Sequence, residues 1–146
     1  NLKPSASVED RKKMLQLMIS EMSGDIIIES FELESNETPN YTIDTIKYLN
    51  LKYIDANLFL VVGQDQYINF NKWKSYKMIK DLVNIICIHR PYFKNVNEKN
   101  CTYINDISCR VSSSLIRLKA NKNVDLIKDF VPRKVLSYIK ESKIYS

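Results

Sequence analysis

The residues Leu58-Phe59-Leu60-Val61-Val62, followed by Gly63, decide how this sequence folds. A continuous apolar run of this length is typical of a parallel strand that is covered on both faces. A second run, Val83-Asn84-Ile85-Ile86-Cys87-Ile88, ends just before Arg90-Pro91. The segment between the two runs is long enough for a crossover helix, which parallel strands require. We therefore expect an α/β fold with a mostly parallel sheet and flanking helices.

Polar caps and the spacing of apolar residues predict the remaining elements. We expect helices capped by Ser7 and by Thr42, a helix through Trp73, helices over residues 113–120 and 132–141, strands over residues 25–29 and 102–107, and a polar loop over residues 93–100. No internal repeat or low-complexity linker interrupts this pattern. We therefore treat residues 1–146 as one domain.

The composition argues against several classes of protein. No apolar run approaches the roughly 20 residues that span a bilayer, and the first residues lack a signal-peptide core. The three cysteines show no CxxC spacing and are accompanied by a single histidine, which argues against a disulfide framework and a structural zinc site. The net charge of +5 suits anionic small molecules about as well as nucleic acid. We expect a soluble, cytoplasmic protein without a metal site of its own.

A serine-rich segment that ends in an arginine is the first candidate for binding anions. It reads Val111-Ser-Ser-Ser-Leu-Ile-Arg117, with the hydroxyls just before a helical pattern. The first N–H groups of a helix have no intrahelical acceptor and, with the helix dipole, favour an anion such as phosphate. Ser113 and Ser114 lie four and three residues before Arg117, so one of them can share its helix face. The alternative is an ordinary capped helix with a solvated arginine.

Gly63, Asp65 and Trp73 form a second group of candidates. Gly63 ends the first apolar run, at the edge of a parallel sheet where ligands bind, and a missing Cβ lets a ligand approach the backbone. Asp65 would then accept hydrogen bonds from ribose hydroxyls, and the Trp73 ring would stack on a planar base. The alternatives are a turn glycine, a capping aspartate and a core tryptophan.

Four segments together resemble the bacterial-type nicotinate mononucleotide adenylyltransferases of the nucleotidyltransferase superfamily. They are Pro39-Asn40-Tyr41-Thr42-Ile43-Asp44-Thr45, Val62-Gly63-Gln64-Asp65 with Trp73, Arg90-Pro91, and the segment from Val111 to Arg117. The ending from Val131-Pro132 onward is similar too. The likeness spans nearly the whole chain and implies a Rossmann-like α/β fold.

The resemblance implies adenylyl transfer from ATP to nicotinate, or nicotinamide, mononucleotide, with Mg²⁺ and without a protein nucleophile. By position, Ser112, Ser114 and Arg117 would face the ATP phosphates with Ser113 beside them, Gly63 and Asp65 would face the nucleotides, and Tyr41, Thr42, Trp73, Lys74 and Arg90 would bind the mononucleotide. Lys74 replaces an aromatic residue of some relatives, which leaves the preference for acid or amide open. No nucleic-acid or membrane partner is implied, and a homo-oligomer is left open.

One departure from the family is large. The family begins with a strand and an H-x-G-H segment whose histidines activate the ATP phosphates, and this chain has no such segment. We expect a further βα unit of roughly 30 residues before Asn1, and an inactive protein without it. A smaller departure is Ser114, where the family usually has threonine. Pantetheine-phosphate adenylyltransferase and a non-catalytic module that binds nucleotides or nucleic acid are the alternative functions.

Overall fold

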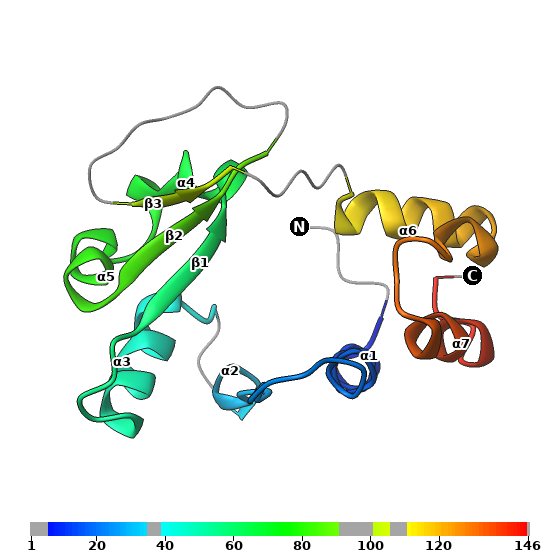
Figure 1. The fold of residues 1–146 in the computed structure, drawn as a ribbon, viewed down its shortest axis with the longest axis horizontal. Coiled ribbons are helices and arrows are strands. Elements are labelled where there is room, and N and C mark those ends of the chain that lie inside the picture. Colours follow the sequence, from blue (N-terminus) through cyan, green and yellow to red (C-terminus); the bar gives the residue numbers. More distant parts are fainter. Residues whose placement is uncertain (1–5, 35–38, 91–100, 106–110, 146) are drawn as a thin grey trace. The chain divides into compact units, whose positions relative to one another are not determined.

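The computed structural model describes residues 6–34, 39–90, 101–105 and 111–145 (Figure 1). The chain divides into two compact units, which we describe separately. The helical unit consists of Asn1–Glu29 and Val111–Ser146, and the sheet unit consists of Ser30–Arg110. The expected loop over residues 93–100 lies outside the described residues. That residues 1–146 form one domain stays a prediction.

A parallel sheet forms the centre of the sheet unit. Its strands are β1 (Phe59–Gly63), β2 (Asn84–Ile88) and β3 (Thr102–Ile104), in the order β1-β2-β3. Both pairs are parallel, and the register aligns Gly63 with Ile88. The two apolar runs therefore form neighbouring parallel strands, as the sequence predicts. The third strand is confirmed over Thr102–Ile104, whereas Asn105 is not part of it, and residues 106–107 of that expectation lie outside the described part of the chain.

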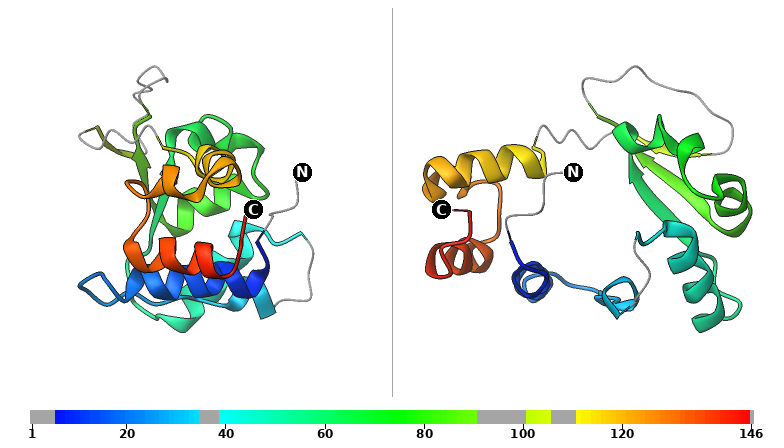
Figure 2. Two further views of the ribbon diagram at one scale, coloured as in Figure 1. Left: turned by 90° about the vertical axis from the view of Figure 1, so that its right-hand side faces the viewer. Right: turned by 180° about the vertical axis from the view of Figure 1, so that it is seen from behind.

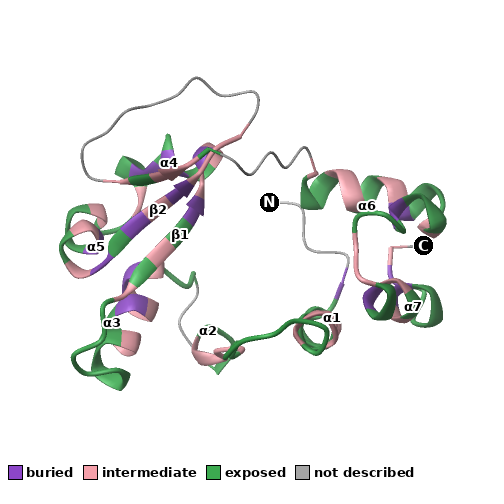
Figure 3. Ribbon diagram, in the orientation of Figure 1, coloured by how far each residue is buried: buried purple, intermediate pink, exposed green. Residues whose placement is uncertain are grey.

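Helices accompany the sheet within the same unit. They are α2 (Phe31–Glu34), α3 (Thr42–Lys52), α4 (Gln64–Tyr67), the 3₁₀ turn η1 (Phe70–Lys72) and α5 (Tyr76–Leu82). Helix α3 packs against α5. Apolar residues from β1, β2, α3, α4, η1 and α5 form one core, and Figure 3 shows buried stretches on both of these strands. Ile43, Ile79 and Cys87 are fully enclosed in it. Burial raises the pKa of the Cys87 thiol to about 11, so this cysteine stays protonated at neutral pH.

The helical unit contains α1 (Val8–Ile19), α6 (Ser113–Lys122), the 3₁₀ turn η2 (Val124–Ile127) and α7 (Arg133–Glu141). Ser7 caps α1 through a reciprocal capping box with Asp10, which confirms the expected helix start. Helices α1 and α7 lie side by side (Figure 2), and the Tyr138 hydroxyl donates a hydrogen bond of 2.8 Å to Asp10. Both expected C-terminal helices are confirmed.

Three expectations about local structure are wrong. Residues 25–29 do not form a strand, and Ile27 is 73% exposed, because no strand of the described residues pairs with this run. Thr42 is the first residue of α3, and Tyr41 is its N-cap. Trp73 lies in extended backbone after η1, because Ser75 adopts a left-handed conformation (φ 53°) and delays the helix to Tyr76.

No helix in the described part of the chain is both long enough and apolar enough to cross a membrane.

Candidate functional site

A cavity of about 230 Å³ in the sheet unit brings together four of the predicted site residues. Its wall comes from the start of α3, from η1 with the residues that follow it, and from α5. The lining residues are Asn40, Tyr41, Thr42, Lys72, Trp73, Lys74 and Ile79. Tyr41 and Thr42 are distant from Trp73 and Lys74 in the sequence, and the packing of α3 against α5 joins them. That this cavity binds a mononucleotide stays a prediction at this point.

Trp73 belongs to both the core and the cavity. Its ring packs at a tilt against Phe70, with 5.1 Å between the ring centroids, and the side chain is half-buried. It also lines the cavity. The two interpretations of Trp73, core residue and stacking platform, are therefore compatible.

Lys74 is held at this cavity by two side chains, those of Tyr41, the N-cap of α3, and of Asp44 in the first turn of that helix. Its ammonium group lies 4.0 Å from the centroid of the Tyr41 ring, a cation–π distance. The same nitrogen lies 3.7 Å from Asp44 Oδ2, and the two side chains are 48% and 34% exposed. An ion pair this exposed adds little stability. Its consequence is electrostatic, because a cation and a compensating anion both lie beside the cavity.

The N-terminus of α3 supplies backbone donors to the same place. The N-cap Tyr41 makes no capping hydrogen bond with its side chain. The N–H groups of Thr42 and Ile43 have no acceptor within the helix, and the helix dipole adds partial positive charge there. Tyr41 and Thr42 line the cavity. A bound anion can therefore take the place of the missing cap.

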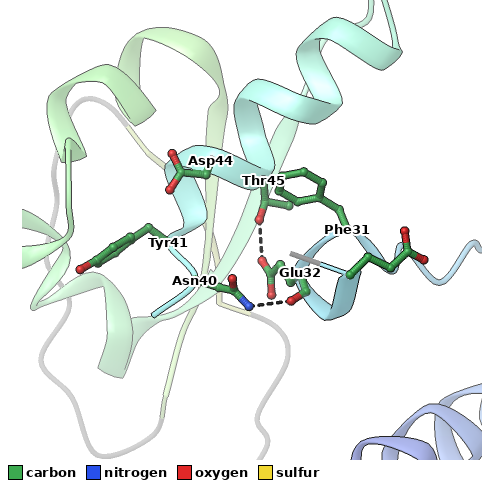
Figure 4. Close-up of a pocket in the computed structure, with 7 residues that line it drawn as sticks. Phe31, Glu32, Asn40, Tyr41, Asp44 and Thr45 are labelled. Atoms are coloured by element: carbon green, nitrogen blue, oxygen red, sulfur yellow. Dashed lines mark hydrogen bonds between the residues drawn. The ribbon is translucent and has the colours of Figure 1, made fainter. Parts of the chain in front are cut away.

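A larger, acidic cavity adjoins the first and shares Asn40 and Tyr41 with it (Figure 4). Its volume is about 500 Å³, and the wall includes the carboxylates of Glu32, Glu34 and Asp44 without a lysine or arginine among the described residues. Asn40 donates to the Glu32 carbonyl, and Thr45 donates to the Glu32 carboxylate, each at 2.6 Å. An anionic ligand is disfavoured here and favoured in the smaller cavity, whose wall includes two lysines.

The ends of β1 and β2 carry a separate polar cluster. Arg90 Nε lies 3.4 Å from Asp65 Oδ1, and the fully buried Gln64 accepts a hydrogen bond of 3.1 Å from the Arg90 N–H. Sequence reasoning named Gly63, Asp65 and Arg90 separately and missed both their pairing and Gln64. The signal was available in part, because aligned parallel runs bring Gly63 and the residues before Arg90 to one edge of the sheet.

In the helical unit, the serine segment forms the start of α6. Ser112 is the N-cap, and its hydroxyl accepts a hydrogen bond from the Leu115 N–H at 3.2 Å. Arg117 Nη2 donates to Ser114 Oγ at 3.2 Å, so Ser114 is the serine that shares a face with the arginine. Ser113 is exposed on the first turn. The helix start and the shared face are thus confirmed, and phosphate binding stays a prediction.

A family model described as cytidylyltransferase-like matches residues 1–119. The chain belongs to this family. A probable nicotinate-nucleotide adenylyltransferase of Borrelia turicatae is 34% identical over 140 residues, which cover 95% of this chain and 72% of that protein. A protein of the same name from Staphylococcus epidermidis is 34% identical over 138 residues, covering 94% and 70%. These relatives agree with the resemblance that the motifs indicate.

Solved structures show the same fold. Plasmodium falciparum nicotinic acid mononucleotide adenylyltransferase complexed with APC matches with a TM-score of 0.77 and 19% identity, covering 96% of this chain and 76% of that one. The same enzyme complexed with NaAD matches with a TM-score of 0.73 and 21% identity, covering 96% and 75%. The α/β fold with a parallel sheet is therefore that of a family member.

Proposed function

We propose that this protein transfers the adenylyl group of ATP to nicotinate mononucleotide, giving nicotinate adenine dinucleotide and pyrophosphate. The cavity that joins Tyr41, Thr42, Trp73 and Lys74 carries this proposal, because it combines an aromatic wall with donors for an anion. The relatives named nicotinate-nucleotide adenylyltransferase support the same reaction.

The cavity beside Trp73 suits the pyridine ring of the mononucleotide. Its volume of about 230 Å³ is below the range of roughly 300–1,000 Å³ for whole-ligand pockets, so it would take the ring and leave the ribose phosphate outside. The ring would stack on Trp73, and its carboxylate would cap α3 through the N–H group of Thr42. A carboxylate gains more than an amide from a helix N-terminus, which favours the acid.

The first turn of α6 suits the phosphates of ATP. Ser113 and Ser114 provide backbone and hydroxyl donors, and Arg117 is oriented by its hydrogen bond to Ser114. Arg90 is a further phosphate candidate, and Asp65 a candidate for a ribose. Mg²⁺ would enter bound to the phosphate oxygens of ATP. Within residues 6–34, 39–90, 101–105 and 111–145, no three His, Cys, Asp or Glu side chains gather as a metal site would require.

The reaction needs no protein nucleophile. A 5′-phosphate oxygen of the mononucleotide forms a bond to the α-phosphorus of ATP, and the bond from that phosphorus to the bridging oxygen of pyrophosphate breaks. The protein's part is to align the two phosphates and to stabilise charge on the departing pyrophosphate. Arg117 and the N–H groups of α6 are suited to the second task.

Product analysis tests the proposed reaction. The full-length protein, incubated with Mg²⁺, ATP and nicotinate mononucleotide, is expected to release pyrophosphate and the dinucleotide in equal amounts. Phosphopantetheine in place of the mononucleotide is expected to give no adenylylated product. Turnover of phosphopantetheine alone would identify a pantetheine-phosphate adenylyltransferase instead. Turnover of neither substrate would contradict the proposal.

Replacing Arg117 by alanine tests its assignment to the ATP phosphates. We expect kcat/KM for ATP to fall about 10²-fold, with kcat also lowered, because the interaction strengthens as charge develops on pyrophosphate. The free energy of unfolding is expected to change by less than about 0.5 kcal/mol. Lys122→Ala, at the far end of the same helix, is the matched control and should leave the kinetics unchanged. Unaltered kinetics in Arg117→Ala would show that Arg117 is only a solvated side chain on the helix surface.

The two charges beside the cavity are expected to change acid selectivity in opposite directions. Lys74→Met leaves the Asp44 carboxylate uncompensated, so kcat/KM for nicotinate over nicotinamide mononucleotide should fall roughly fivefold, as about 1 kcal/mol at about 4 Å in water implies. Asp44→Asn should raise the same ratio. Lys77→Met, on α5 and outside the cavity wall, is the control. Equal ratios in all four proteins would show that the ring carboxylate binds elsewhere.

Trp73 is expected to report binding of the mononucleotide. Addition of nicotinate mononucleotide should quench or shift the fluorescence of this single tryptophan, whereas ATP should have little effect. Trp73→Ala should raise KM for the mononucleotide and cost less than the ~3–5 kcal/mol of a fully buried tryptophan, because the ring is half-buried. Trp73→Phe should retain most of the affinity. Fluorescence that does not change when the mononucleotide is added would show that Trp73 has only a packing role.

A further inference from the structure

Gly63 has an ordinary backbone conformation, which raises the question of why glycine is found there. Its φ of −73° and ψ of 150° lie in the extended region that any residue adopts. Glycine is thus not required by the backbone at this position. The chain holds only two glycines, and the other, Gly24, does have a positive φ of 114°.

The space beside the Gly63 Cα explains the glycine. A Cβ built on this residue would lie 2.6 Å from Asp65 Oδ1 and 3.6 Å from Arg90 Nε. The first distance is too short for a carbon and an oxygen that are not bonded, so the carboxylate would have to move. What approaches Gly63 closely is therefore the side chain of Asp65, two residues along the same chain.

Asp65 is also held in this position by Arg90, which lies beside the same space. The 3.4 Å between Arg90 Nε and Asp65 Oδ1 is an ion-pair distance, and Oδ1 is buried without a hydrogen-bond donor in the described part of the chain. The Asp65 side chain is nevertheless 40% exposed. Its accessible part therefore lies away from Oδ1. One oxygen faces Gly63 and Arg90, and another part of the side chain is exposed to solvent.

Gln64 fixes the backbone on which Arg90 depends. This side chain is fully buried, and its Oε1 accepts the Arg90 N–H at 3.1 Å. The bond joins the start of α4 to the residues that follow β2. A Cβ at Gly63 would therefore push Oδ1 away from Arg90 and lengthen the ion pair, because the anchored main chain of Arg90 cannot follow.

We propose that Gly63 is a positioning residue that acts through Asp65. The missing Cβ leaves the room in which the carboxylate turns one oxygen toward Arg90 and keeps its exposed side for a nucleotide. This inference rests on the proposed function for the identity of the ligand. It differs from the interpretation in which Gly63 admits a ligand directly to its backbone.

A double-mutant cycle separates the two roles. In the protein with Asp65 intact, Gly63→Ala should lower kcat/KM at least tenfold, because a misplaced binding group is costly. In an Asp65→Ala background, where no carboxylate remains to clash, Gly63→Ala should change kcat/KM by less than about twofold. In an Asp65→Asn background, whose side chain has the same shape, the loss should persist. A loss of similar size in the Asp65→Ala background would overturn the proposal in favour of direct ligand approach.

Urea unfolding of the same variants gives a second reading that needs no activity. Gly63→Ala is expected to lower the unfolding midpoint with Asp65 present and to leave it unchanged with Asp65→Ala. If Gly63→Ala alone does not fold, recovery of folding in the double variant supports the proposal, and failure of both variants contradicts it. A protein without adenylyl transfer would defeat the proposed function, while the unfolding cycle would still decide the role of Gly63.

Discussion

The parallel pairing of β1 with β2 is the constraint on which the rest of the sheet unit depends. The register runs from Phe59 opposite Asn84 to Gly63 opposite Ile88, so both strands end at the same level. Because the ends coincide, the chain that leaves β1 through Gly63 meets the chain that leaves β2 at Arg90. The ion pair of Asp65 with Arg90 and the buried hydrogen bond of Gln64 both follow from this alignment.

The candidate binding groups in both units share one property, which is that they suit an anionic ligand. In the sheet unit, the start of α3 offers uncapped N–H groups, and lysines line the cavity beside it. In the helical unit, the start of α6 offers N–H groups with Ser114 and Arg117 on one face. The adjoining acidic cavity lacks these features and shows that the positive character is local. In the proposed function, helix N-termini with few cationic side chains would bind both ligands, one in each unit.

The sequence predicted those elements whose signal is local. The apolar runs of β1 and β2 and the helix cap at Ser7 are visible in consecutive residues, and all three are present. The run over residues 25–29 also has an apolar centre, Ile26-Ile27-Ile28, but an apolar run becomes a strand only when another strand pairs with it. The backbone of Ser75 is a second limit, because a left-handed residue that is not glycine leaves no trace in the apolar spacing.

The sequence could predict which residues belong to the candidate site, but not how they are arranged. Tyr41, Thr42, Trp73 and Lys74 follow from their likeness to family motifs, and the structure gathers them at one cavity. The contacts of Lys74 with Tyr41 and Asp44 depend on how α3 packs against α5. Register and packing are long-range properties, so the sequence could name these residues but could not pair them.

Binding of the ring carboxylate at the start of α3 is the central claim of this account, and amide NMR measures it directly. In a ¹⁵N-labelled protein, nicotinate mononucleotide is expected to shift the N–H resonance of Thr42 strongly, and nicotinamide mononucleotide to shift it much less. The difference is expected because only the acid carries a charge that can cap the helix. Equal shifts with the two ligands, or an unshifted Thr42 resonance at saturating nicotinate mononucleotide, would contradict the account.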